Sequence, residues 1–251
     1  MNTHSVITDF SWHLDELVTV LPIVLTIVFF VIFWFTSKSA KIKTWFYQKY
    51  DFDQASVRHI TFGRLVGFLC MCIIPGIICL ILLPEYSLAD YGLTYNPETI
   101  QFTIFWTFTL SLLVIPLAFI SGQKPKNLVN YPMIRAKVWN NKIVVLNALG
   151  WALYLFGYEF LFRGLLLFPL AEHLGVWTAI AINISLYSAT HIPKGLEETL
   201  GAIPLGLVLC LLTLASGTIW IAFFVHVAMA WTNSFTALKF HPDIHYKRSS
   251  L

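Results

Sequence analysis

Apolar residues in this chain gather in long runs that short polar segments separate. Runs of nearly 20 apolar residues are long enough to cross the hydrocarbon core of a bilayer as helices. The pattern therefore predicts an all-α fold, a polytopic transmembrane helix bundle of about seven spans. We place these spans at about Leu17–Phe35, Ile60–Leu83, Ile100–Ile120, Ile143–Leu170, Trp177–Ile192, Leu200–Ala215 and Thr218–Leu238.

The fourth run is longer than a bilayer requires at a helical rise of about 1.5 Å per residue. It must therefore tilt, protrude from the membrane or be broken near Gly157. A break would turn the run into two half-spans and raise the number of spans to eight.

Charged residues in the connecting segments predict an orientation. The segments after the first and third spans are basic, whereas the loop after the second span holds acidic residues and no basic one. Because basic loops stay on the cytoplasmic side, we expect an integral multi-pass protein of the cell membrane with its N-terminus outside and its C-terminus in the cytoplasm. The basic residues are Lys38, Lys41, Lys43, Lys49 and Arg58, then Lys124, Lys126, Arg135, Lys137 and Lys142; the acidic ones are Glu85, Asp90 and Glu98.

The composition agrees with a membrane protein. Hydrophobic residues make up 57% and charged residues 12% of the 251-residue chain, and the mean hydropathy is +0.72. An average soluble domain has roughly 25% charged residues. The net charge of +3 is modest and sits in loops, so we expect the lipid bilayer as a partner and no nucleic acid.

Two ionisable side chains interrupt the fourth run. Glu159 and Arg163 are four residues apart, so on a helix they share one face and can pair. Charged groups at membrane depth cost several kcal/mol each and persist mainly where they pair or line a reaction site. The pair is therefore either a structural ion pair between helices or part of a catalytic site.

Two histidines in later spans are the natural partners of this pair. His191 ends a polar stripe with Asn183 and Tyr187, and His226 shares a helix face with Asn233. Counted along the spans, Glu159 and both histidines lie at compatible depths near the middle of the membrane. A carboxylate and two histidines on three spans suit general-base catalysis with oxyanion stabilisation, although either histidine alone also fits an interhelical hydrogen bond.

At these residues the sequence resembles the intramembrane proteases that include the type II CAAX prenyl endopeptidases and the bacteriocin-immunity (Abi or CPBP) proteins. That family has three motifs on separate spans: Glu-Glu-x-x-x-Arg, an aromatic residue followed by x-x-x-His, and His-x-x-x-Asn. The matching stretches are Tyr158-Glu159-Phe160-Leu161-Phe162-Arg163, Tyr187-Ser188-Ala189-Thr190-His191 and His226-Val227-Ala228-Met229-Ala230.

The resemblance covers roughly residues 140–233 and implies a division of the chain. N-terminal transmembrane helices and loops occupy 1–139, a CPBP/CAAX-protease-like transmembrane core occupies 140–238, and a short basic tail occupies 239–251. Tyr158 stands where the family has its first glutamate, and Ala230 stands where it has the asparagine of the third motif.

The resemblance implies an intramembrane endopeptidase that acts on membrane-associated peptides or proteins, prenylated ones included. Glu159, restrained by Arg163, is then the general base toward a water bound by His191, and His226 donates to the oxyanion. Tyr158, Tyr187 and Asn233 are the expected supporting residues. The alternative is a non-proteolytic immunity or scaffold protein that binds a lipid or a partner helix with the same polar cluster.

We expect no cofactor for this chemistry. A zinc ion held by Glu159, His191 and His226 is the open alternative, because three nitrogen or oxygen ligands plus water form a catalytic zinc pattern. The chain has no His-Glu-x-x-His helix, and these ligands would come from three separate spans.

Overall fold

The computed structural model describes residues 11–248. Residues 1–10 and 249–251 lie outside the described residues, and with them the N-terminus that we expect outside the membrane and the end of the predicted basic tail.

Every apolar run of the sequence forms a helix. Within the described residues, 6 helical segments are long and apolar enough to cross a membrane, and a shorter apolar helix, Val176–Ala189, joins them. The predicted all-α transmembrane bundle is therefore confirmed. The six segments are Leu14–Lys49, Phe52–Leu82, Ile100–Gly122, Asn141–Leu174, Leu196–Ser216 and Trp220–Phe240.

The N-terminal half contains three of these segments. Side chains of Ser39 and Asp51 cap the helices that follow them, by accepting the backbone N–H of Ile42 and Gln54, and such caps satisfy amides that have no partner within the helix. The elements are η1 (Leu14–Glu16), α1 (Leu17–Ser37), α2 (Ala40–Lys49), α3 (Phe52–Phe68), the π-helix η2 (Leu69–Ile73), α4 (Ile74–Leu82), α5 (Ile100–Gly122) and α6 (Pro125–Leu128).

The C-terminal half contains the other three segments and the shorter helix. Gly217 ends α10 in the left-handed region at φ 67°, which glycine adopts without steric cost. The elements are β1 (Val138–Trp139), α7 (Asn141–Glu159), the π-helix η3 (Phe160–Leu167), α8 (Phe168–Leu174), α9 (Val176–Ala189), η4 (Ile192–Lys194), α10 (Leu196–Ser216), α11 (Trp220–Phe240) and β2 (His245–Tyr246).

The long fourth run is one continuous helical segment, with no break at Gly157. Its winding changes from α to π directly after Glu159, and the π turns continue to Leu167. π-helical turns are rare and are often found at functional sites. Helix α9 is short by comparison: its 14 residues reach about 21 Å, less than the roughly 30 Å of a hydrocarbon core.

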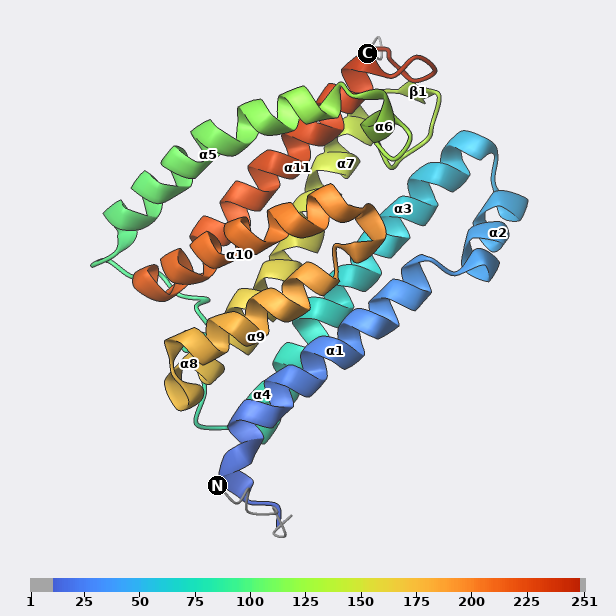
Figure 1. The fold of residues 1–251 in the computed structure, drawn as a ribbon. Coiled ribbons are helices and arrows are strands. Elements are labelled where there is room, and N and C mark those ends of the chain that lie inside the picture. The colour runs from blue at the N-terminus through green and yellow to red at the C-terminus, as the bar shows by residue number, and fades with distance from the viewer. Residues whose placement is uncertain (1–10, 249–251) are drawn as a thin grey trace, which may run out of the picture.

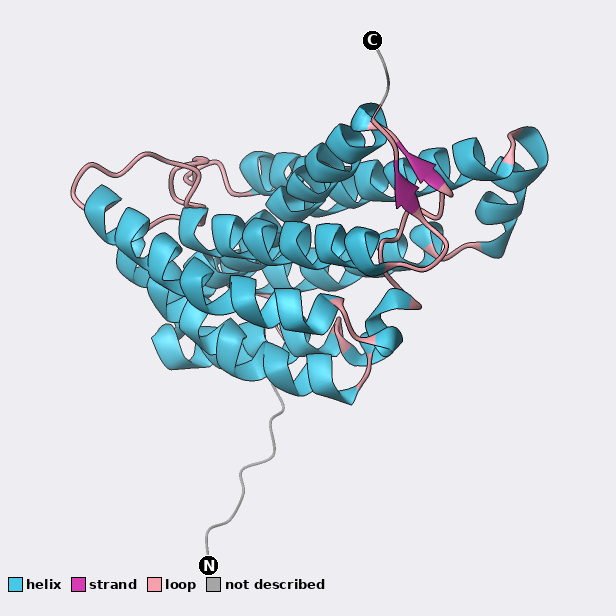
Figure 2. Ribbon diagram, turned by 90° about the horizontal axis from the view of Figure 1, so that it is seen from above, coloured by secondary structure: helices cyan, strands magenta, loops and turns pink. Residues whose placement is uncertain are grey.

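The helices pack around α7 and its π-helical continuation. Helix α11 lies along both α5 and α7, α3 packs on α7, and α9 pairs with α10 (Figure 1). The small parallel pairing of β1 with β2 ties the chain end to the segment before α7 (Figure 2). The α7–η3 segment therefore has neighbours from both halves of the chain, which places its side chains deep inside the bundle.

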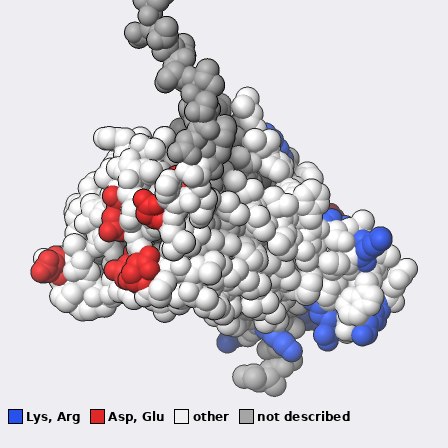
Figure 3. All heavy atoms as spheres, turned by 90° about the horizontal axis from the view of Figure 1, so that it is seen from below, with Lys and Arg blue, Asp and Glu red and all other residues white. Residues whose placement is uncertain are grey.

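Outward-facing surfaces suit a lipid environment. Side chains of α5 such as Ile104, Phe108 and Leu112 are 61–64% exposed, which is expected of apolar groups that face acyl chains rather than water. On the face drawn in Figure 3, acidic side chains lie toward one end and basic side chains toward the other. The charge separation seen in the loops of the sequence is therefore a separation in space.

A second buried polar cluster joins α3, α7 and α11. Arg64 is 5% exposed, and its guanidinium donates to the backbone carbonyl and the side-chain oxygen of Asn147, both at 2.9 Å. Asn147 in turn donates to Ser234 Oγ at 3.1 Å, and the Arg64 guanidinium lies 4.5 Å from the ring centre of Trp151. The cluster satisfies a cation that lipid could not solvate.

Replacing Asn147 by alanine tests this cluster. The change removes the side-chain acceptor of the buried Arg64 cation, so we expect the free energy of unfolding to fall by about 1–3 kcal/mol. Unfolding of the purified protein in mixed detergent micelles, followed by circular dichroism, measures this. Lys142→Ala, an exposed position near the start of the same helix, is the control and should change stability little. Equal effects of the two substitutions would contradict the role given to Asn147.

Candidate active site

Five predicted side chains from three helical segments meet at one place. Glu159 ends α7, Arg163 lies in η3, His226 lies on α11, Tyr187 lies on α9, and Tyr158 precedes Glu159. All five are at most 5% exposed, and Glu159 and Arg163 are completely buried. The structure therefore brings together groups that the sequence separates by up to about 70 residues.

The centre of the site is the ion pair between Glu159 and Arg163. The Arg163 Nε atom lies 3.5 Å from Glu159 Oε2, and both side chains have no exposed area. The Arg163 guanidinium also stacks over the Tyr187 ring, 4.2 Å from its centre. A buried carboxylate keeps its charge at tolerable cost only beside such a cation.

Glu159 and Tyr187 also flank the imidazole of His226. The Nδ1 atom of His226 is hydrogen-bonded to Glu159 Oε1, and because an ionised carboxylate only accepts, the Nδ1–H must donate. In the neutral ring Nε2 is then an acceptor, and the Tyr187 hydroxyl donates to it over 3.1 Å. The result is a relay of carboxylate, imidazole and phenol.

A second set of hydrogen bonds connects Tyr158 with the end of α9. Thr190 Oγ1 donates to the backbone carbonyl of Tyr187 over 2.7 Å, so the Tyr158 hydroxyl, at 2.8 Å, donates to Thr190. His191 Nδ1 lies 3.0 Å from the same carbonyl and donates to it. The half-buried His191 ring packs against the Tyr187 ring, with 4.8 Å between centres.

Local contacts explain why the helix widens here. In a π turn the backbone hydrogen-bond ladder shifts, and Asn183 Nδ2 donates to the Phe162 carbonyl over 2.6 Å. Gly164 follows Arg163 because a Cβ there would lie 2.8 Å from the Tyr91 carbonyl oxygen and 2.8 Å from the Phe160 ring. The Phe-Arg-Gly ending of the first motif therefore has a steric reason.

Asn233 and Ala230, two positions considered in the motif comparison, lie away from the Glu159 carboxylate. Asn233 accepts a hydrogen bond from Asn127 over 3.0 Å, so the structure places it with α6 rather than with Glu159. Ala230, in the place of the motif asparagine, packs against an apolar cluster that includes Trp151 and Leu155. Thr190 was missed as a site residue, although a hydroxyl directly before His191 in an apolar helix was a usable signal.

Glu159, His191 and His226 are not grouped as a metal site in the described part of the chain. Among residues 11–248, no group of three histidine, cysteine, aspartate or glutamate side chains is arranged to hold a metal ion. His226 turns its Nδ1 to Glu159, and His191 turns its Nδ1 to a backbone carbonyl. No step proposed below uses a metal.

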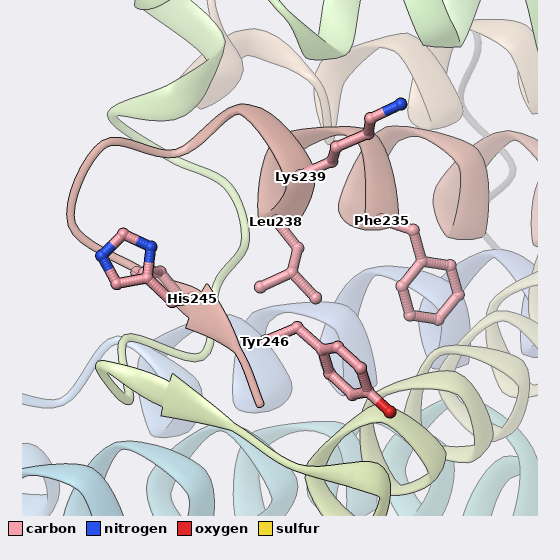
Figure 4. A pocket seen from close by; sticks show the side chains of 6 residues that line it. Phe235, Leu238, Lys239, His245 and Tyr246 are labelled. Atoms are coloured by element: carbon pink, nitrogen blue, oxygen red, sulfur yellow. The ribbon is translucent and has the colours of Figure 1, made fainter. Parts of the chain in front are cut away.

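The surface pocket at the chain end is separate from this site. It has a volume of about 380 Å³ and lies between the end of α11 and β2 (Figure 4). Its walls are Phe235, Leu238, Lys239, Ile244, His245 and Tyr246, and they include none of the predicted site residues.

The buried ion pair between Glu159 and Arg163 should contribute to the free energy of unfolding. Arg163→Met leaves Glu159 as an uncompensated buried carboxylate, so we expect a loss of about 3–5 kcal/mol in the free energy of unfolding. The double variant Glu159→Gln with Arg163→Met contains no buried charge at this pair and should recover most of that loss. Denaturant titration of four proteins in detergent, the wild type, the two single variants and the double variant, measures the coupling. Additive effects would mean that the two groups do not stabilise each other.

Comparison with known proteins identifies a family to which part of the chain is similar. Residues 140–232 match the protein-family model described as "Rce1-like: Type II CAAX prenyl endopeptidase Rce1-like", which is less than half of the chain. No curated protein and no solved structure matches. The matched residues contain Glu159, Arg163, Tyr187, His191 and His226. The resemblance predicted from the three motifs is thereby confirmed: the segment that holds the site is similar to the type II CAAX prenyl endopeptidase family.

Proposed function

We propose that this protein is a membrane-embedded endopeptidase that hydrolyses peptide bonds of membrane-associated proteins, lipidated ones included. The observation that carries the proposal is the buried relay from Glu159 through His226 to Tyr187, next to Arg163. Ionisable groups inside a membrane bundle are costly and are retained where chemistry needs them. The similarity to prenyl endopeptidases over residues 140–232 supports the same reading.

In this mechanism His226 is the general base. A water at the Tyr187 hydroxyl gives a proton to that oxygen while the hydroxyl proton moves to Nε2 of His226. The imidazolium then returns a proton through the same hydroxyl to the leaving amine. Glu159 holds the Nδ1–H and stabilises the imidazolium that forms, as a carboxylate does for a catalytic histidine in hydrolases of other folds. Arg163 pairs with the other oxygen of the same carboxylate and holds it in place.

The order of groups differs from the one that the sequence predicts. There, Glu159 itself takes the proton from a water bound by His191. In the structure one Glu159 oxygen faces His226 and the other faces Arg163, which favours His226 as the group that takes the proton. Tyr158 donates to Thr190 and half-buried His191 donates to the Tyr187 carbonyl. Both would turn these protons from their present acceptors to the substrate carbonyl as its oxyanion forms.

The substrate would reach the site from the basic end of the bundle. Acidic and basic side chains lie toward opposite ends of the molecule (Figure 3), and the positive-inside rule assigns the basic end to the cytoplasm. This supports an N-terminus outside, a C-terminus inside and a place in the cell membrane.

The non-proteolytic alternative has one observation in its favour. Glu159 and Arg163 have no exposed area and form an ion pair with each other, so each of the two charges has a partner without a substrate. An immunity or scaffold protein with this fold would use the cluster to hold its helices together and bind a lipid or a partner helix elsewhere.

Glu159→Gln separates the two functions. We expect the wild type to generate new termini in a library of membrane-anchored and prenylated peptides, and the variant to lose at least 10³-fold in rate, because the histidine loses its stabilising carboxylate. Mass spectrometry of the products detects the cuts. The matched control is Glu172→Gln in the same helical segment, where the exposed carboxylate accepts only the Tyr86 hydroxyl over 2.9 Å. Cleavage that survives in Glu159→Gln would overturn the proposal.

Tyr187→Phe tests the last member of the relay. The ring that stacks on Arg163 remains, so the fold should persist while the hydroxyl partner of His226 is lost. We expect kcat to fall by about 10²-fold with little change in KM, since the hydroxyl acts on the reacting atoms. Steady-state cleavage of the best library peptide gives both constants. An unchanged kcat would remove Tyr187 from the mechanism.

A further inference from the structure

The basic segment that joins the first two spans forms its own surface. Helix α2 follows α1 after a turn at Lys38 and Ser39, and packs on α3. Phe46 is buried against this neighbour and Ile42 is half-buried, whereas the lysines at 41, 43 and 49 are exposed. The helix is therefore amphipathic, with its apolar side on the bundle and its charged side outward.

An open apolar groove lies beside these lysines. It has a volume of about 500 Å³ and is lined by Lys41, Ile42, Trp45, Phe46 and Phe62. Trp45 is 51% exposed, and tryptophan side chains are usually buried in the protein or located at a membrane interface. Lys41 is the only charged residue of the lining, so the groove offers apolar walls and one cation at its edge.

The charges around the groove lack acidic partners. Five cations belong to the segment: Lys38, Lys41, Lys43, Lys49 and Arg58. Within residues 11–248, no carboxylate lies at ion-pair distance from any of them. The two acidic residues in the same part of the sequence form hydrogen bonds with backbone amides. Asp51 accepts the N–H of Gln54, and Asp53 accepts the N–H of Lys137.

Aromatic rings hold several of these cations in place. The Lys49 ammonium lies 4.8 Å from the Trp45 ring centre, and the Arg58 guanidinium lies 4.4 Å from the Tyr50 ring centre. Lys38 lies 5.2 Å from the Trp34 ring centre. Such contacts limit the freedom of long side chains. Because Trp45 lines the groove, its contact holds the Lys49 charge beside the groove.

We propose that the groove between α2 and α3 binds one anionic phospholipid, with an acyl chain against Trp45 and Phe62 and the headgroup phosphate at Lys41 and Lys49. Clusters of basic residues on an amphipathic helix next to a span are the usual recognition element for anionic headgroups. The apolar walls favour a ligand with an acyl chain, which free phosphate does not have. This site is independent of the proposed proteolysis.

Native mass spectrometry of the full-length protein tests the site. Phosphatidylglycerol and phosphatidylcholine with the same acyl chains are titrated into the detergent-solubilised protein. We expect one phosphatidylglycerol to be retained, and binding at least tenfold weaker in Lys41→Gln with Lys49→Gln. The matched control, Lys124→Gln with Lys142→Gln, removes the same charge from exposed lysines outside α2 and should bind like the wild type.

A second measurement reports the position of the lipid. Brominated phosphatidylglycerol should quench tryptophan fluorescence more than brominated phosphatidylcholine, and this excess should disappear in Trp45→Phe. Equal loss of binding in both lysine pairs would mean general surface attraction only. Equal binding of the two lipids would mean an apolar groove without headgroup recognition, and dimers formed in place of lipid binding would assign the groove to a second copy. Each of these results would overturn the proposal.

Discussion

The structure depends on one constraint: a carboxylate and a guanidinium inside an apolar bundle must satisfy each other and their neighbours. Glu159 and Arg163 have no exposed area, so each polar atom near them needs a partner within the protein. Tyr187 provides three of these contacts. Its ring stacks on Arg163, its hydroxyl donates to His226, and its carbonyl accepts hydrogen bonds from Thr190 and His191. The position of α9 against η3 follows from these contacts.

The residues that depart from the family motif are accommodated by different chemistry. The Tyr158 phenol fills the place of a carboxylate and reaches Thr190, so this side of the site carries a hydroxyl donor instead of a second negative charge. Ala230 fills the place of an amide and packs in an apolar cluster. With Tyr158 in place of a carboxylate, Glu159 is the one carboxylate that the described residues place at His226, and this is why their pairing dominates the proposed mechanism.

Much of the fold and part of the site could be predicted from the sequence. Helical spans follow from the length of apolar runs, and the Glu159–Arg163 pair follows from four-residue spacing on a helix. Which histidine meets Glu159 could not be predicted, because it depends on the rotation of α9 and α11 about their axes. The shift to π winding is likewise a result of packing at Gly164 and Asn183. Arg64 was missed, although the argument that singled out Glu159 applies equally to a cation inside the second span.

The central claim is that the relay of Glu159, His226 and Tyr187 activates water for peptide hydrolysis. The most direct measurement is a single-turnover reaction in ¹⁸O-labelled water, with mass analysis of the new carboxyl terminus. The account predicts one ¹⁸O atom in each new carboxylate, formed at a rate that depends on His226 and is lost in His226→Ala. Label incorporation at an unchanged rate in His226→Ala would contradict it.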